Sequence, residues 1–226
     1  MRMDNWWEQE SLIKFESPTS IFVVSPSGSG KTILTKQILT HANAMFTIPP
    51  SQIFFCYSVY QDLYTEMKKQ IRNIHFHQGL PSKEILREWG DMKGHKIVVF
   101  DDLMMDAADS DEIVHLMCVG SHHYQITVIH ILQNLFQKGK SMRTASLNCH
   151  YFILMANKRD TLQISTLGRQ IFPGQLKFFM QSFTLATQRK KFGYLLVDIM
   201  PRSDKTYQLR TNILPGESTI VYQPIK

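Results

Sequence analysis

The sequence is poor in cysteine and has no long apolar run. Its 226 residues include three isolated cysteines, Cys56, Cys118 and Cys149. An odd number of scattered cysteines is not typical of a disulfide framework, and a reducing compartment is the simpler expectation. The longest apolar runs, such as "YFILMA", are far shorter than the roughly 20 residues that a membrane-spanning helix needs. The sequence therefore argues against a disulfide scaffold and against a membrane partner.

A secretory signal and long disorder are also missing. The first residues, "MRMDNWWEQESLIKF", carry acids and no continuous apolar core, so we expect no signal peptide and an intracellular protein. Hydrophobic residues make up 43% of the chain and charged residues 19%, which is typical of a globular protein. The length allows one sizeable core, and hence one domain with short additions.

Acidic residues are scarce in the last two-fifths of the chain. Residues 136–226 hold 14 lysines and arginines but only 4 acids, whereas residues 1–135 hold 11 and 15. The net charge of +6 therefore comes entirely from the C-terminal part. Such segregation suits a polyanionic partner, most often nucleic acid, although a solvated basic face would have the same composition. The segment "TQRKKF" (187–192) is the best single candidate for a DNA contact, or else a basic cluster at a helix end.

Apolar strand-like runs alternate with helix-like segments along the chain. The pattern predicts helices between strands at residues 19–25, 52–59, 74–79, 95–100, 126–134 and 149–157. Continuous apolar strands separated by helices indicate an α/β fold with a mainly parallel sheet covered on both faces. Two further helical segments, 160–172 and 174–192, precede a C-terminal β-hairpin of residues 193–200 and 207–214.

The stretch "IFVVSPSGSGKTILTKQIL" (21–39) has the pattern of a phosphate-binding loop between a strand and a helix. In such a loop the backbone N–H groups and the helix N-terminus cradle phosphates, the lysine neutralises them, and the Ser/Thr hydroxyl reaches Mg²⁺. Ser25 stands where the usual pattern has its first glycine, which we expect to cost little because that position mainly shapes the turn. The predicted nucleotide-binding residues are Ser27, Gly28, Ser29, Gly30, Lys31 and Thr32.

A pair of carboxylates ends another predicted strand, in "KIVVFDDLM". Asp101 would hold Mg²⁺, and Asp102 could orient or deprotonate the attacking water. Two adjacent buried carboxylates are hard to justify by packing, because each would be desolvated beside a like charge. Asp102 could instead cap the helix that follows it.

Gln133 and Asn134 end the next strand on the same predicted edge. A glutamine in this place can contact both the γ-phosphate and the lytic water, although ordinary hydrogen bonding at a strand end is an equally good interpretation of the two residues. Arg143 and Arg159 flank the strand at 149–157. Either could reach the γ-phosphate of a neighbouring subunit, with Arg143 the better candidate, and this role would require a ring or filament.

A competing motif is "NKRD" (157–160), which follows an apolar strand as the guanine-reading motif of GTPases does. A GTPase also needs a glycine after its metal-binding aspartate, and "DDLMMD" has none. Asp160 is better explained as the cap of a helix that starts at Thr161. The histidine pairs His75/His77 and His122/His123 could ligate a metal, but no clustered cysteines or carboxylates accompany them.

Taken in order, the loop, the DD-ended strand, the Gln-ended strand and the arginine before a strand resemble the FtsK/HerA superfamily of P-loop ATPases. The likeness covers roughly residues 19–200 and is closest to the genome-packaging ATPases of double-stranded DNA viruses and of Polinton/Maverick (adintovirus-like) elements. The resemblance implies a RecA-like (ASCE) fold, with residues 1–18 as a leader, 19–200 as the ATPase domain and 201–226 as a hairpin and tail packed on it.

The same resemblance implies residue roles. Lys31 and Thr32 would bind phosphate and Mg²⁺, Asp101 the metal, Asp102 would be the catalytic acid, Gln133 the sensor and Arg143 the finger in trans. It also implies ATP hydrolysis by a homo-oligomeric ring that threads duplex DNA into a preformed capsid. The expected partners are then double-stranded DNA and viral capsid proteins, at an assembly site in the host nucleus or cytoplasm or in association with the virion.

This chain departs from the superfamily at two positions, Ser25 and Asp102, where many relatives have glycine and glutamate. The shorter aspartate reduces the reach to water. A subunit that binds nucleotide and DNA without turnover, or that assists capsid assembly, is therefore a third hypothesis beside the ATPase and the GTPase.

Overall fold

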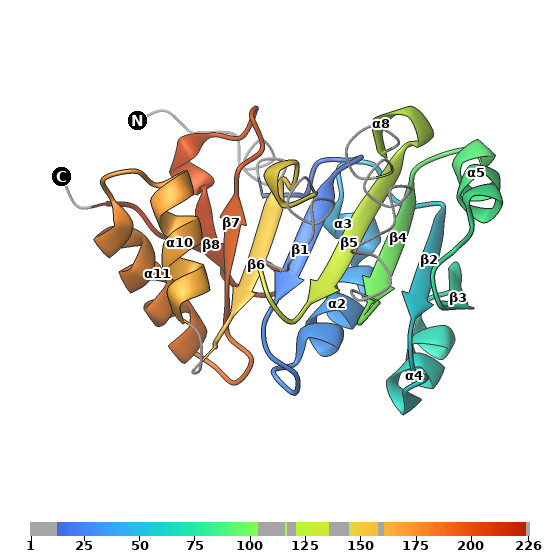
Figure 1. Cartoon of the computed structure of the whole chain (residues 1–226), viewed down its shortest axis with the longest axis horizontal. Coiled ribbons are helices and arrows are strands. Elements are labelled where there is room, and N and C mark those ends of the chain that lie inside the picture. The colour runs from blue at the N-terminus through green and yellow to red at the C-terminus, as the bar shows by residue number, and fades with distance from the viewer. Residues whose placement is uncertain (1–12, 104–115, 117–120, 136–144, 158–160, 225–226) are drawn as a thin grey trace.

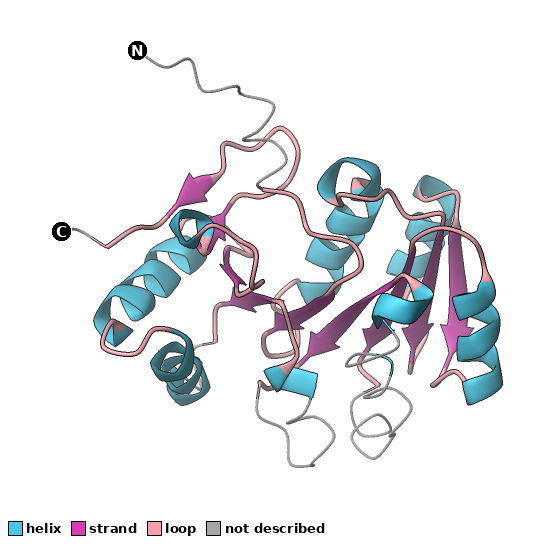
Figure 2. Cartoon of the chain, turned by 90° about the horizontal axis from the view of Figure 1, so that it is seen from above, coloured by secondary structure: helices cyan, strands magenta, loops and turns pink. Residues whose placement is uncertain are grey.

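The computed structural model of the protein describes residues 13–103, 116, 121–135, 145–157 and 161–224. They form a nine-stranded sheet with helices on both faces (Figures 1 and 2). The strand order is β3-β2-β4-β5-β1-β6-β7-β8-β9. This confirms the predicted α/β class with a mainly parallel sheet and antiparallel strands at the C-terminal end.

Six strands form the parallel part of the sheet. They are β1 (Ser20–Val24), β2 (Gln52–Tyr57), β3 (Ile74–Gln78), β4 (Lys96–Asp101), β5 (Ile126–Leu132) and β6 (Tyr151–Met155). The antiparallel strands β7 (Tyr194–Asp198), β8 (Leu209–Thr211) and β9 (Ile220–Val221) extend the sheet beyond β6. The two-residue β9 was not expected, because so short a strand has no readable alternation.

The helices follow the predicted order with small shifts at their ends. They are α2 (Lys31–Thr40), α3 (Ala42–Met45), α4 (Asp62–Gln70), α5 (Lys83–Asp91), α8 (Ser121–Tyr124), α10 (Thr161–Ile171), α11 (Leu176–Gln188) and the 3₁₀ helix η2 (Lys205–Tyr207). The helix predicted between the strands at 95–100 and 126–134 falls mostly outside the described residues. Helix α11 ends within the basic segment 187–192, so residues 189–192 lie in a connection to β7 rather than in a helix.

The side chains of β1 alternate between two hydrophobic clusters, one on each face of the sheet. Ile21 and Val23 join the hydrophobic cluster that includes side chains of α2, α3 and α4. Phe22 and Val24 join the cluster that includes side chains of α5, α10 and α11. Successive side chains of a strand point to opposite faces, so an apolar run of this kind requires cover on both.

Strand β1 lies inside the sheet, paired with β5 on one side and β6 on the other. Strand β5 therefore separates β1 from β4. Because β1, β4 and β5 are parallel, their carboxyl ends meet at one edge, where ligands bind in open α/β sheets.

A buried ion pair joins the C-terminal strands to each other. Arg210 Nη2 of β8 donates to Asp198 Oδ2 of β7 at 3.0 Å, and both side chains are almost fully buried. Burial raises the pKa of Asp198 and lowers that of Arg210, while their mutual attraction opposes both shifts. Arg210 is thus a structural residue and does not contribute to a basic surface.

Among the helices that the structure describes, none is both long enough and apolar enough to cross a membrane.

The described cysteines, Cys56 and Cys149, are free and buried, and burial raises the pKa of both thiols. Cys118, like Trp6 and Trp7, lies outside the described residues.

Candidate functional site

The loop between β1 and α2 contains two glycines in the left-handed conformation. Gly28 has φ 76° and Gly30, the residue that caps α2, has φ 89°. Side chains other than hydrogen disfavour this region, so the two positions require glycine for the turn. Gly30 has a second constraint, because a Cβ there would lie 2.7 Å from Phe192 Cδ1. The loop is thereby bent so that the N-terminus of α2 faces the carboxyl edge of the sheet, as an anion site requires.

Ser25 fits its position without strain. It is not among the described non-glycine residues with positive φ. Its N–H donates to the Leu132 carbonyl at 3.1 Å, and its hydroxyl donates to the Ala156 carbonyl at 3.1 Å. The serine therefore ties the end of β1 to the ends of both neighbouring strands, and a glycine would lose one of these hydrogen bonds.

Lys31 lies folded back into the loop. Its Nζ donates to the carbonyls of Ser25 at 2.5 Å and Pro26 at 2.8 Å, and the residue is 9% exposed. Desolvation lowers the pKa of the ammonium, and the nearby carboxylates of Asp101 and Asp102 oppose that shift. Phosphate oxygens are stronger acceptors than carbonyls, so an entering anion could take over these hydrogen bonds.

Asp101 ends β4 and is held by two hydroxyl groups. Thr32 Oγ1 and Tyr64 Oη each donate to Asp101 Oδ2 at 3.1 Å. The carboxyl group is 4% exposed; burial raises its pKa, while these two hydrogen bonds and the Lys31 charge oppose the shift. Hydroxyl and carboxylate oxygens from Thr32 and Asp101 are the hard ligands that Mg²⁺ prefers.

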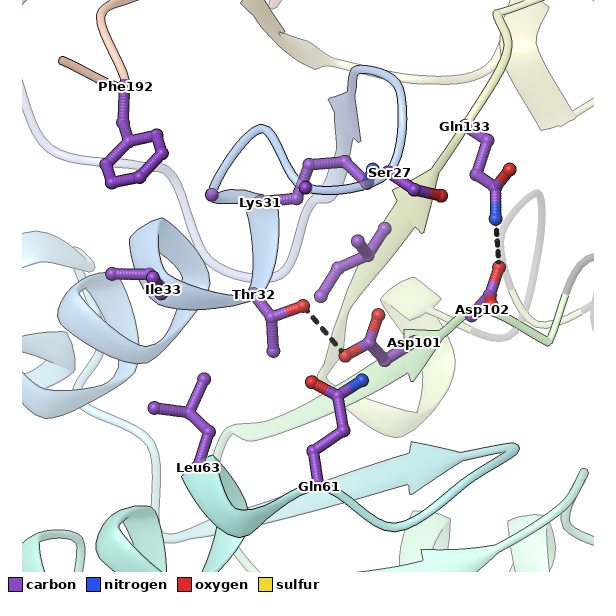
Figure 3. A pocket seen from close by; sticks show the side chains of 13 residues that line it. Ser27, Lys31, Thr32, Ile33, Gln61, Leu63, Asp101, Asp102, Gln133 and Phe192 are labelled. Atoms are coloured by element: carbon purple, nitrogen blue, oxygen red, sulfur yellow. Dashed lines mark hydrogen bonds between the residues drawn. The ribbon is translucent and has the colours of Figure 1, made fainter.

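Asp102 turns away from the strand and meets a side chain from β5. Its φ of 55° lies in the left-handed region that aspartate tolerates better than most residues. Gln133 Nε2, just after β5, donates to Asp102 Oδ1 at 2.7 Å (Figure 3). The carboxylate is thus positioned by an amide from the next strand. The helix that Asp102 was alternatively expected to cap lies outside the described residues.

These side chains line one cavity of about 430 Å³. Lys31 and Asp101 both face it, so the loop and the acidic strand end share one edge of the sheet. Figure 3 shows Thr32 and Asp101 near its centre, with Asp102 and Gln133 at one end and Phe192 at the other. The lining residues are Ser27, Gly28, Gly30, Lys31, Thr32, Ile33, Gln61, Leu63, Asp101, Asp102, Ile131, Gln133 and Phe192. Ser29 does not line the cavity; its hydroxyl donates to the Pro26 carbonyl at 2.6 Å and braces the loop.

Several predicted site residues remain untested. Arg143 and Arg159 lie outside the described residues, as do positions 158–160 of the "NKRD" segment. Asn157 is described and follows β6, on the opposite side of β1 from β5. The arginine finger and the guanine-reading motif therefore stay predictions.

The basic segment 187–192 has partners within the chain. Lys190 forms an ion pair with Glu217, and its Nζ lies 5.7 Å from the Tyr194 ring centroid. Lys191 Nζ lies 5.2 Å from the centroid of the Phe192 ring, beside the cavity. Its role as a DNA contact stays a prediction.

Sequence patterns missed several residues of the site, three of which have polar or aromatic side chains. Tyr64 belongs to α4, and Gln61 immediately precedes that helix. The sequence pattern of this segment predicted only a helix after a strand. Phe192 comes from the far C-terminal part of the chain. None of the three belongs to a motif with fixed spacing, and only the folding of the sheet brings them to the loop.

The histidine pairs show no metal site in the described part of the chain. No group of three or more His, Cys, Asp or Glu side chains there could hold an ion. His75 Nε2 is 2.7 Å from Gln52 Oε1, and the His77 ring packs against Trp89.

Comparison with known proteins gives matches among solved structures alone: no family model and no curated protein matches the sequence. The crystal structure of B204, the DNA-packaging ATPase of Sulfolobus turreted icosahedral virus, superposes with a TM-score of 0.57 at 12% identity, over 92% of this chain and 99% of that one. The genome-packaging NTPase B204 of Sulfolobus turreted icosahedral virus 2 in complex with ATP-γ-S gives 0.55 at 12% identity, over 92% and 98%.

The same viral NTPase in complex with AMP gives a TM-score of 0.54 at 11% identity, again over 92% of this chain and 98% of that one. Nearly the whole of each chain is matched. At this identity the likeness establishes the fold. The chain shares the α/β fold of these viral NTPases.

Proposed function

We propose that this protein is a Mg²⁺-dependent ATPase that drives double-stranded DNA into a viral capsid as a subunit of a homo-oligomeric ring. The observation that carries the proposal is the single cavity that joins Lys31 and Thr32 to Asp101, Asp102 and Gln133. Packing alone gives no reason to bury a lysine and a carboxylate beside a second carboxylate. The likeness to packaging NTPases over 92% of the chain supports the choice of DNA packaging.

The donor set fits a magnesium nucleotide. Mg²⁺ in such sites takes one or two protein oxygens and completes its shell with phosphates and water, so Thr32 and Asp101 suffice. When bound, the ion neutralises charge on the β- and γ-phosphates. The loop amides from Ser27 to Lys31 would bind the phosphate oxygens. Lys31 would exchange its carbonyl acceptors for them, which favours its charged form.

Asp102 would act on the attacking water. Its carboxylate lies at the end of the cavity beyond Thr32 and Asp101 (Figure 3), where water would approach the γ-phosphate. Gln133 holds Asp102 Oδ1 at 2.7 Å, and the other carboxylate oxygen would accept a proton from the water. Loss of the γ-phosphate would disturb this contact, which links nucleotide state to β5.

The first test is DNA-stimulated ATP hydrolysis. Lys31→Ala should lower the rate by at least about 10²-fold, because it removes the cation beside the transferred phosphate. The matched control is Lys36→Ala on the same helix, whose ammonium pairs with Glu66 at 2.7 Å on the surface, and it should keep the wild-type rate. Full DNA-stimulated activity in Lys31→Ala would refute the proposal.

The same preparation separates the alternatives. A GTPase would bind GTP far better than ATP in competition against a fluorescent ATP analogue. A nucleotide-regulated assembly subunit would bind ATP tightly without turnover, with or without duplex DNA. The mass of the assembly in the presence of ATP tests the ring.

A further inference from the structure

The end of the cavity away from the carboxylates is apolar. Figure 3 places Phe192 and Ile33 on the side of the loop opposite Asp102 and Gln133. Both are partly exposed, Phe192 by 38% and Ile33 by 43%, although each lines the cavity. A nucleoside triphosphate has the same polarity, since its phosphates are charged and the flat faces of its base are apolar.

We propose that Phe192 is the base-binding residue of this site, with its ring stacked on the purine of the nucleotide. The proposal rests on the proposed function, since the Thr32–Asp101 end is taken to hold the β- and γ-phosphates. With the phosphates there, the only cavity wall among the described residues that offers an aromatic ring is Phe192. Stacking on one ring recognises any purine, so this contact does not choose between ATP and GTP.

Phe192 is held in place by strained backbone. Its φ of 63° is in the left-handed region, which is unusual for an aromatic residue. Such conformations persist only where the surroundings impose them, and they cluster at functional sites.

The following glycine shows how the conformation is imposed. A Cβ at Gly193 would lie 2.7 Å from the Ala186 carbonyl oxygen, so the chain passes directly against the end of α11. Gly193 N also donates to the Lys190 carbonyl at 2.9 Å. The tight turn between α11 and β7 thus directs the Phe192 ring over Gly30.

Lys191 is the present neighbour of the ring, with its Nζ 5.2 Å from the centroid. A cation–π contact at an exposed site is weak, and a flexible lysine is readily displaced. An entering purine could therefore take its place on the ring, while the ammonium moves toward the phosphates.

The experiment compares ATP with inorganic tripolyphosphate, which has the phosphates but no base, by calorimetry with Mg²⁺. In Phe192→Ala the affinity for ATP should fall about tenfold while the affinity for tripolyphosphate stays within twofold of wild type. Phe192→Trp, which keeps an aromatic ring at this position, should bind ATP with about the wild-type affinity. Leu185→Ala, which removes an exposed apolar side chain of α11 that does not line this cavity, is the control and should change neither affinity.

The variant Phe192→Gly controls for misfolding, because glycine adopts a φ of 63° without strain. It should melt no lower than Phe192→Ala and show the same selective loss of ATP binding. An equal loss for both ligands, or no loss for either, overturns the base-binding role. If Lys31→Ala still abolishes binding of both ligands in that case, the proposed function stands. If the wild type binds neither ligand, the proposed function fails together with this inference.

Discussion

At the scale of single residues, the site depends on donors that orient a buried acid. Asp101 Oδ2 accepts from both Thr32 and Tyr64, and without them the carboxylate would be desolvated with little compensation. Thr32 belongs to the loop motif, whereas Tyr64 belongs to α4, on another connection of the sheet. A hydrogen bond such as the one from Tyr64, a residue that would not itself bind the metal, fixes the direction in which a ligating oxygen points.

Tyr64→Phe should therefore raise the Mg²⁺ concentration needed for half-maximal ATPase activity by about 10- to 100-fold. The aromatic ring is kept, so the packing against Phe55 and Phe76 should survive. Magnesium titration at saturating ATP measures the effect. Tyr57→Phe is the control, because this residue belongs to the same aromatic cluster and its hydroxyl makes no described hydrogen bond to Asp101. A shifted ATP requirement with an unchanged Mg²⁺ requirement would contradict the positioning role.

At the scale of elements, β5 positions Gln133 in the site and also contains a buried histidine that lowers stability in acid. It ends at Leu132, directly before Gln133, and the residue two positions before its end is the buried His130. The His130 ring stacks on Phe100 at 4.8 Å, and within the described structure its Nε2 has no hydrogen-bond partner. Burial lowers the pKa of His130 to about 3, and burial likewise lowers the pKa of His95, the residue before β4, to about 4.

These two histidines predict acid sensitivity of the fold. In the unfolded chain each takes up a proton near pH 6.5, whereas in the folded chain each stays neutral down to its lowered pKa. Their contribution to stability is thus full above about pH 6.5 and is lost as the pH falls toward about 4 for His95 and about 3 for His130. Each lowers the free energy of unfolding by about 1.4 kcal/mol per pH unit in that range.

His130→Phe should remove one of these two protons from the pH dependence measured by urea unfolding between pH 7 and pH 4.5. Phe100→Leu is the control: it should destabilise through lost packing and leave the slope with pH unchanged. An unchanged slope in His130→Phe would show that the histidine is already protonated in the folded state.

At the scale of the whole molecule, the site lies at one edge of the sheet, and one part of the proposed machinery, an arginine, is expected from a neighbouring subunit. The described part of the cavity contains one cation, Lys31, among its lining side chains. An arginine supplied in trans would complete the charge around the γ-phosphate.

Mixing two inactive variants tests this arrangement. Arg143→Ala should lower ATPase activity by about 10³-fold, as expected for loss of a finger. Mixed rings of Lys31→Ala and Arg143→Ala subunits contain interfaces with an intact loop facing an intact arginine, so activity should partly return. Arg169→Ala, at an exposed position of α10, is the control and should stay active alone. Activity that never returns on mixing would place the arginine in cis or outside the site; the same experiment with Arg159→Ala decides between the two candidates.

The strands and the loop were readable because their signals are local. An apolar run such as "KIVVF" cannot be solvated, and "GSGKT" combines the glycines and cation of a phosphate loop, so β4, β1 and α2 follow from a few consecutive residues. The ends of the elements were predicted less accurately: β5 ends at Leu132 rather than at residue 134, and α11 ends at Gln188 rather than at residue 192. Hydrogen bonding and packing decide where an element ends.

The amino-acid sequence by itself determined the class of fold, the loop and the two acids that face it. Only the tertiary structure decided that Tyr64 holds Asp101, that Gln133 holds Asp102 and that Phe192 lies over Gly30. The pairs are 37, 31 and 162 positions apart in the chain. No periodicity reports such contacts, because they depend on which strands become neighbours and on where each connection returns to the edge of the sheet.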